Sequence, residues 1–268
     1  MNTQESLIEI AHSAGRIILA AHDERARLPT AVERKTAIGD LVTDTDREVE
    51  TFIVDKIRET FGESAFVGEE GGGNVGLGTT WIVDPIDGTT NFVHGFPWCA
   101  VSIARIEQRQ PNLAVVHGPF SNETFYASAG RGAYMRSPSI QIDKRLSVSR
   151  TLSIDSALIS FGLPYDKDRG EEVFELAARL FAQCQDLRRT GSAALDLCAV
   201  ASGRTDAHVE LDLRLWDLAA ATLILQEAGG TLIGRSGKEI DWGLARQKHD
   251  VICSNGFLLS AVRSVVDF

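Results

Sequence analysis

The sequence has few cysteines, and nothing in their arrangement suits a zinc site or a disulfide framework. The four residues are scattered along the chain, mostly inside apolar runs such as WCAVSIA and LDLCAVA: Cys99, Cys184, Cys198 and Cys253. There is no CxxC pair, and no histidine stands at zinc-ligand spacing from a cysteine. We therefore expect buried free thiols.

Positive charge and long apolar runs are also scarce. The 268 residues include 27 Lys and Arg against 37 Asp and Glu, which gives a net charge of -10. A protein that binds nucleic acid or a membrane surface needs a basic face, so we expect neither partner. The first residues, MNTQESLIEIAHSAGRIILAA, lack a basic start and an unbroken apolar core, and no other stretch approaches membrane-spanning length. These features predict a cytoplasmic protein.

Two helices are expected near the N-terminus. Apolar residues recur every three or four positions from Leu7 to Ala21, which is typical of an amphipathic helix. A possible capping box at Thr45 and Glu48 predicts the start of the second helix, and Gly62 predicts its end.

The remaining elements differ between the two halves of the chain. Short apolar strands follow one another closely up to about residue 150, which favours antiparallel pairing: AFVGEE, WIVDPID, WCAVSIARI, LAVVHG and ETFYAS. Beyond Thr151, strands alternate with helices such as EEVFELAARLFAQC and LWDLAAATLILQEAGG, which is typical of an α/β fold. Without a repeat or a proline-rich linker, we expect one compact unit over 1–268, with lobes of about 1–150 and 151–268.

Five acidic residues stand where a strand meets a loop or where a helix begins: Glu69, Glu70, Asp84, Asp87 and Asp217. If these carboxylates gather, they repel one another, and burial costs several kcal/mol per charge. A divalent cation would remove that cost. Oxygen ligands without cysteine or histidine suit Mg²⁺ or Mn²⁺ better than Zn²⁺.

The turn after these strand residues is suited to an anion. Gly88 allows close approach of the backbone, and Thr89, Thr90 and Asn91 open a short helix whose free amides can bind phosphate. Metal carboxylates beside a phosphate site are the components of metal-assisted phosphate-ester hydrolysis.

Each acidic residue also has a purely structural interpretation. Asp followed by Gly is a common turn, and Asp217 could simply complement a helix dipole, as could Asp46. Glu69 and Glu70 could be a solvated pair before a glycine-rich loop. The combination of motifs decides between these interpretations.

Three motifs together resemble the inositol monophosphatase family of Mg²⁺-dependent, lithium-sensitive sugar phosphatases. They are GEE at 68–70, WIVDPIDGTTNFVHGFP at 81–97 and LWDLAAATLILQEAGG at 215–230, in the order and spacing of the family. The segments KTAIGDLVTDTDREVE at 35–50 and RRTGSAALDLCAVASGRTDAHVE at 188–210 also match, so the resemblance covers nearly the whole chain.

The resemblance implies a fold and a set of metal ligands. The fold is an α/β (α+β) layered αβαβα sandwich, with a larger antiparallel sheet, a smaller mixed sheet and the active site where the two halves meet. About two or three Mg²⁺ ions, with Mn²⁺ as a substitute, are the implied cofactors. Their ligands are Glu69, Asp84, the main-chain carbonyl of Ile86, Asp87 and Asp217.

The resemblance also assigns roles in catalysis. Thr89, hydrogen-bonded toward Asp46, helps Glu69 to orient and deprotonate the metal-bound water, and the amides of Gly88 and Thr89 hold the phosphate. The resemblance places three residues in a weaker metal site and the mobile loop beside it: Lys35, Asp40 and Glu70. It places four residues against the sugar ring of the substrate: Asp87, Ser192, Ala193 and Glu210. Lys35 also has an interpretation as a solvated loop lysine.

Two departures from the family pattern leave the alcohol part of the substrate open. His208 and Val209 precede Glu210 where an aromatic pair is frequent, and Arg214 and Leu215 stand before Trp216 where a proline is frequent. The expected activity is therefore hydrolysis of myo-inositol 1-phosphate or a related sugar monophosphate by metal-activated water.

Other activities stay open at this stage. Fructose-1,6-bisphosphatase and histidinol phosphatase activities occur on similar sequences, whereas Thr90 stands where nucleotide bisphosphatases tend to carry lysine. A binding protein that had lost its chemistry would show a broken ligand set, and this ligand set is intact. The resemblance further implies a homodimer.

Overall fold

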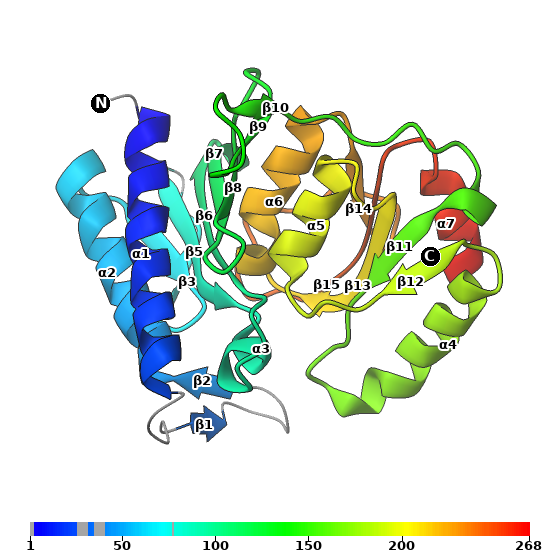
Figure 1. The fold of residues 1–268 in the computed structure, drawn as a ribbon, viewed down its shortest axis with the longest axis horizontal. Coiled ribbons are helices and arrows are strands. Elements are labelled where there is room, and N and C mark those ends of the chain that lie inside the picture. The colour runs from blue at the N-terminus through cyan, green and yellow to red at the C-terminus, as the bar shows by residue number, and fades with distance from the viewer. Residues whose placement is uncertain (1–2, 26–31, 35–40, 77) are drawn as a thin grey trace.

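The computed structural model describes residues 3–25, 32–34, 41–76 and 78–268. These residues form five layers that alternate between helices and sheets (Figure 1). The layered α/β fold expected from the sequence is therefore confirmed. Lys35 and Asp40, two residues predicted to lie in the loop near the metals, fall outside the described residues.

Paired helices make up the outer and middle layers. The first layer holds α1 (Thr3–Arg25) and α2 (Asp44–Phe61), the middle layer α5 (Ala193–Ala201) and α6 (Leu215–Glu227), and the last layer α4 (Gly170–Phe181) and α7 (Leu259–Val266). Two short 3₁₀ turns cover Ile154–Ser156 and Lys167–Arg169. The sequence places apolar side chains all round the middle helices because a sheet covers each side of them.

The larger sheet has the strand order β10-β9-β8-β7-β6-β5-β3-β4. Its strands are β3 (Ala65–Gly68), β4 (Gly72–Gly73), β5 (Thr80–Asp87), β6 (Ala100–Glu107), β7 (Gln110–Gly118), β8 (Glu123–Ser128), β9 (Ala133–Arg136) and β10 (Lys144–Arg145). Most neighbours are antiparallel, but β3 and β5 are parallel, with Ala65 opposite Thr80. The antiparallel pairing expected there is wrong, because the glycine-rich link forms the edge strand β4 and returns the chain to the same end of the sheet.

The smaller sheet is mixed and has the order β12-β11-β13-β15-β14. Its strands are β11 (Leu158–Phe161), β12 (Asp186–Arg188), β13 (Ala207–Leu213), β14 (Thr231–Gly234) and β15 (His249–Ser254). Strand β11 runs parallel to β12 and β13, whereas β15 is antiparallel to both β13 and β14. The register of β13 breaks between Glu210 and Leu213, where Asp212 has a positive φ of 66°. This bulge leads directly into α6.

Helix α2 begins two residues earlier than the sequence motif indicated. Thr43 is the N-cap, and its backbone N–H donates to Asp46 Oδ2 at 2.8 Å while its hydroxyl accepts from the Asp46 amide at 3.4 Å. The predicted box at Thr45 and Glu48 is therefore wrong, because Thr43 and Asp46 have the same spacing and satisfy the first free amides. The short strands β1 (Val32–Arg34) and β2 (Leu41–Thr43) pair just before this cap. Gly62 ends the helix as predicted.

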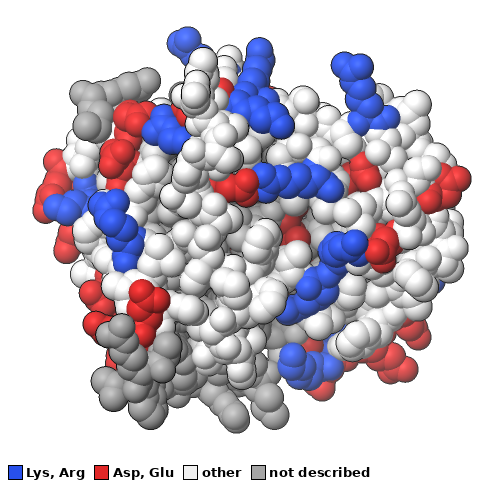
Figure 2. Space-filling view, viewed as in Figure 1, with Lys and Arg blue, Asp and Glu red and all other residues white. Residues whose placement is uncertain are grey.

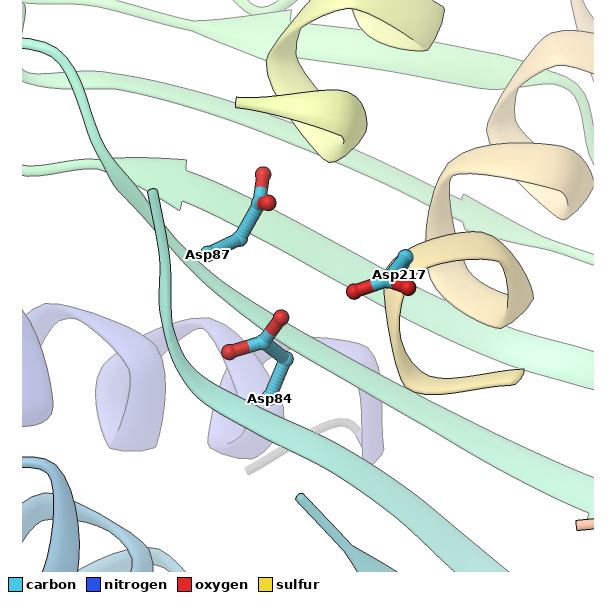
Figure 3. A group of neighbouring side chains, drawn as sticks. All are labelled: Asp84, Asp87 and Asp217. Atoms are coloured by element: carbon cyan, nitrogen blue, oxygen red, sulfur yellow. The ribbon is translucent and has the colours of Figure 1, made fainter. Parts of the chain in front are cut away.

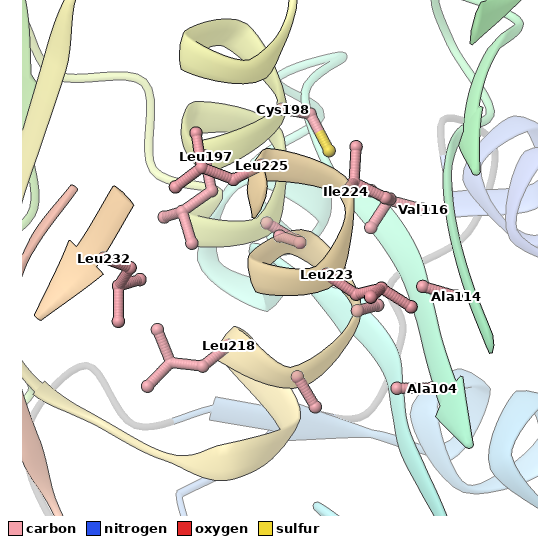
Figure 4. Packing of buried hydrophobic residues seen from close by; sticks show 14 of the residues in the cluster. Ala104, Ala114, Val116, Leu197, Cys198, Leu218, Leu223, Ile224, Leu225 and Leu232 are labelled. Atoms are coloured by element: carbon pink, nitrogen blue, oxygen red, sulfur yellow. The ribbon is translucent and has the colours of Figure 1, made fainter. Parts of the chain in front are cut away.

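The hydrophobic core lies between the layers rather than at one centre. Figure 4 shows Leu218, Leu223 and Leu225 of α6, with Leu232 of the smaller sheet and Ala114 of the larger sheet in the same cluster. The thiols of Cys99, Cys198 and Cys253 are buried and free, whereas that of Cys184 is only partly buried. Within the described ranges, no helix combines the length and apolar character that crossing a membrane requires.

We expect Leu218→Ala to lower the free energy of unfolding by about 2–5 kcal/mol, because the side chain is fully buried between two sheets and its loss leaves a cavity. Urea unfolding measures this as a lower midpoint with an unchanged slope. Leu152→Ala is the matched control, since Leu152 is 73% exposed and should change stability by less than about 0.5 kcal/mol. Equal effects at both positions would contradict the layered core.

Stability should also fall on acidification because of a buried histidine between α1 and the larger sheet. His117 accepts or donates at Thr124 Oγ1 over 3.0 Å, and its burial lowers its pKa from 6.5 to about 4. Between these values the unfolded chain binds a proton that the folded chain does not, so stability rises with pH. We expect His117→Gln to flatten the loss of stability between pH 6.5 and 4, measured by urea midpoints. An unchanged slope would exclude this role.

Candidate metal and phosphate site

Three aspartates meet at the end of β5 and the start of α6 (Figure 3). Asp84, Asp87 and Asp217 each offer a carboxylate oxygen, and these oxygens lie within 4.8 Å of one another. Residues three apart on a regular strand point to opposite faces. The register break between Asp84 and Asp87 removes this alternation, so that both side chains reach the same site.

The electrostatics of this group fit a divalent cation. Burial raises the pKa of Asp87 to about 7, and hydrogen bonds from Ser192 and Ala194 only partly oppose this effect. Burial, followed by the charges of Glu69 and Asp87, raises the pKa of Asp217 far above its usual range. Asp217 is partly accessible through the cleft, yet its carboxylate lies deep enough for burial to be the leading cause. An all-oxygen donor set under such repulsion suits a hard divalent metal.

Asp87 also connects the larger sheet to the middle helical layer. Its carboxylate accepts from the Ser192 hydroxyl, from the Ala194 amide at 2.8 Å and from the Ala193 amide at 3.2 Å. Ser192 is the buried N-cap residue of α5. Its hydroxyl donates to Asp87. Ala193 lines the open cleft, as does Glu210.

The turn after Asp87 places a hydroxyl between two acceptors. Gly88, the N-cap of the short helix α3 (Thr89–Val93), has φ 97°, and a Cβ there would lie 3.0 Å from the Gly191 carbonyl. Thr89 Oγ1 lies 3.1 Å from Asp46 Oδ1 and 3.0 Å from the Ile86 carbonyl, so its single proton can go to either oxygen. Asp46 is fully buried, which is more than a helix-dipole role would require.

The two glutamates that follow β3 occupy different environments. Glu69 lines the cleft, and its charge contributes to the raised pKa of Asp217. Glu70 does not line this cleft; its amide and that of Gly71 donate to the Glu50 carboxylate at 2.9 and 2.6 Å. Glu50 therefore connects α2 to the turn that carries Glu69. Glu50 was not predicted from the sequence, because nothing distinguishes it from the other acidic residues of an amphipathic helix.

A cleft of about 510 Å³ opens above the aspartates, between the two sheets. Tyr165 and Arg189 line it and were not predicted. Burial raises the pKa of the Tyr165 hydroxyl, and the charges of Glu69 and Asp217 raise it further, even though 47% of the residue is exposed. Across the described ranges, Arg189 has neither a hydrogen bond nor an ion pair, whereas its neighbour Arg188 pairs with Asp186. In the sequence the two arginines are indistinguishable.

The layered fold and its buried acidic cluster fit a metal-dependent phosphatase. The sequence profile of the inositol monophosphatase family matches residues 3–267. The chain belongs to the inositol monophosphatase family.

Individual relatives agree with this assignment. Nus factor SuhB of Escherichia coli strain K12 is 37% identical over 234 residues, which cover 86% of this chain and 84% of the relative. Putative Nus factor SuhB of Neisseria meningitidis serogroup B is 33% identical, over 96% of this chain and 94% of the relative. The solved structure of Thermotoga maritima IMPase superposes with a TM-score of 0.84 at 35% identity, over 97% of this chain and 94% of that chain. The extragenic suppressor protein suhB from Bartonella henselae has a TM-score of 0.87 at 31% identity, covering 98% and 97% of the two chains.

Proposed function

We propose that the protein hydrolyses a sugar or polyol monophosphate, with myo-inositol 1-phosphate as the first candidate, to the free alcohol and inorganic phosphate. The observation that carries this proposal is the cluster of Asp84, Asp87 and Asp217, because Asp87 directly precedes the Gly88 turn. A cluster of carboxylates beside free backbone amides suits a metal-bound phosphate group.

We propose Mg²⁺ as the metal, with Mn²⁺ as a substitute. Its ligands would be Glu69, Asp84, the Ile86 carbonyl, Asp87 and Asp217, with Glu70 at a weaker, water-mediated position. When bound, the metal supplies positive charge that stabilises the attacking and leaving oxygens. The ligand set comes from the turn after β3, from β5 and from α6, so an assembled fold is required to hold it.

The chain's own groups then divide the remaining work. The amides of Gly88 and Thr89 hold the phosphate oxygens at the start of α3. Glu69 accepts the proton of the attacking water. Thr89 donates its hydroxyl proton to Asp46, 3.1 Å away, so its oxygen is left to accept a hydrogen bond from that water and orient it. Asp46 stays fixed because it also accepts from the Thr43 amide at 2.8 Å. Ser192, Ala193 and Glu210 flank Asp87 on the side where the alcohol would leave.

Positive groups on the alcohol side keep a second substrate class open. Arg189 and Arg214 both line the cleft, and they could hold a second anionic group such as the distal phosphate of fructose 1,6-bisphosphate. Histidinol phosphate would instead bring a positive charge toward these arginines. The geometry thus favours a sugar mono- or bisphosphate.

The test compares Mg²⁺-dependent phosphate release from myo-inositol 1-phosphate, fructose 1,6-bisphosphate, histidinol phosphate and adenosine 3',5'-bisphosphate. Arg189→Ala separates the two leading classes of substrate. It should lower phosphate release from a bisphosphate far more than release from a monophosphate, whereas Arg188→Ala should affect neither. No release from any ester by metal-loaded protein would reject the phosphatase proposal and favour a binding role.

We also propose a cytoplasmic location, together with a homodimer and lithium inhibition, the last two of which the family resemblance supports. Sedimentation measures the assembly state, and a lithium titration at fixed Mg²⁺ measures inhibition. A monomer at micromolar concentration, or activity unchanged by lithium, would reject the corresponding proposal.

A role in association with the transcription machinery is a second candidate, supported by the relatives named Nus factor SuhB. The expectation of no nucleic acid partner came from the net charge alone. Figure 2 shows Lys and Arg interspersed with Asp and Glu on one face, which favours a protein partner over direct contact with nucleic acid. Co-purification with RNA polymerase, unchanged by Asp217→Asn, would support a role separate from hydrolysis.

A further inference from the structure

A buried histidine lies beside the glutamate in the wall of the cleft. His208 and Glu210 are two residues apart on β13, so their side chains share one face of the sheet. His208 Nε2 lies 3.0 Å from Glu210 Oε2, and its Nδ1 lies 2.8 Å from the hydroxyl of Ser160 on β11. His208 is 0% exposed, so these two contacts fix the ring.

The partners determine which ring nitrogen carries the proton. A carboxylate only accepts hydrogen bonds, so Nε2 must donate to Glu210. The Ser160 hydroxyl satisfies Nδ1 in either charge state of the ring, because it can donate or accept. Burial lowers the pKa of His208, but the hydrogen bond to Glu210 and the charge of Asp196, 3.9 Å away on α5, outweigh that effect and raise it overall.

Glu210 is confined from a second side. A Cβ on Gly162, just beyond the end of β11, would lie 1.8 Å from Glu210 Cδ, so the glutamate occupies the space that glycine leaves. Its Oε2 is engaged by His208, whereas its Oε1 accepts no hydrogen bond from the described residues and lies where a Cβ on Gly162 would come within 1.9 Å of it. Glu210 lines the cleft together with Asp87 and Ala193. Contacts with His208 and with the space at Gly162 therefore hold the Glu210 carboxylate in place.

We propose that His208 is a specificity-determining positioning residue, which holds Glu210 so that Oε1 accepts a hydrogen bond from a hydroxyl of the substrate's alcohol. This inference rests on the proposed phosphatase function and deepens it. It predicts that esters with a hydroxyl at the contact position are selected over esters without one.

The experiment uses Mg²⁺-loaded enzyme and two esters. One is the sugar or polyol phosphate that the wild type hydrolyses best, and the other is 4-nitrophenyl phosphate, which has no alcohol hydroxyl. We expect His208→Phe to lower kcat/KM about tenfold to a hundredfold for the first ester, mainly through KM, because a hydrogen bond to a charged group is lost. The second ester should change less than about twofold. His208→Gln, which retains an N–H donor, should restore part of the loss.

Two further variants separate positioning from damage to the fold. Glu210→Gln should give the same selective loss, and the double variant with His208→Phe should lose little more, because both changes remove one contact. Gly162→Ala should displace the flexible end of Glu210 and reproduce the selectivity change with both partners present. Equal losses on the two esters, or additive losses in the double variant, would overturn the proposal. If the wild type releases phosphate from neither ester, the phosphatase function itself fails.

Discussion

Asp217→Asn should reduce kcat/KM by about a thousandfold or more, because removing one ligand charge forfeits several kcal/mol of stabilisation of the developing oxygens. The side chain amide can still accept from the Arg214 amide, which Asp217 contacts at 2.6 Å, so the start of α6 should remain capped. Phosphate release under saturating Mg²⁺ measures the loss. Calorimetric titration with Mg²⁺ should show weaker binding in the same variant.

The same substitution should stabilise the metal-free protein. The pKa of Asp217 is raised in the folded state, so the folded chain holds a proton that the unfolded chain releases, and stability falls as pH rises above the ordinary aspartate range. Asn removes this unfavourable charge. Urea unfolding in EDTA at pH 7.5 should therefore give a higher midpoint for the variant, and added Mg²⁺ should stabilise the wild type more than the variant.

Asp44→Asn is the matched control for this experiment. Asp44 also lies in the first turn of a helix, but it is exposed and distant in sequence from the cluster. Its substitution should leave hydrolysis unchanged. If Asp217→Asn kept full activity and lost stability instead, Asp217 would be only a helix-terminus residue, and the metal assignment would be wrong.

Thr89→Ala should lower kcat by about 10²- to 10⁴-fold and leave KM nearly unchanged, because the hydroxyl orients the attacking water without holding the ester. Thr89→Ser keeps the oxygen that lies 3.1 Å from Asp46 and should retain most of the activity. Steady-state kinetics on the best ester distinguish the two parameters.

Asp46→Asn tests the acceptor at the other end of this hydrogen bond. We expect a loss similar to that of Thr89→Ala, and a double variant little worse than either single variant, because both changes interrupt one hydrogen-bonded unit. Full activity in Thr89→Ala would exclude the relay and leave Asp46 as the cap partner of Thr43 alone.

The sequence could predict the parts of the site that depend on local spacing. The motif around Asp84 and Asp87 predicted both residues beside a glycine turn, and the structure brings them together with Asp217 from a helix 130 residues later. Helix periodicity and Gly62 predicted the body and the end of α2. The Asp84–Gly88 motif and the course of α2 could be predicted because each depends on contacts within a few residues.

Features that depend on distant packing could not be predicted. The parallel pairing of β3 with β5 depends on where the glycine-rich link runs, and the early start of α2 depends on which of two similar threonines is placed to cap. Glu50, Tyr165 and Arg189 carry no local signal, because their positions follow from the approach of other elements. The contacts between Glu50 and two amides join residues twenty and twenty-one positions apart.

The Asp87 carboxylate belongs to the aspartate cluster and also accepts hydrogen bonds from the first turn of α5. Each amide that it satisfies on α5 is also a reason for the two layers to dock in one register. If the layers did not dock, the Asp87 carboxylate would lose these amide partners, and the three aspartates of the cluster would no longer lie together. The ability to bind a cation is therefore a property of the assembled interface between the layers. A partly folded chain would expose the same acidic side chains to water without forming a binding site.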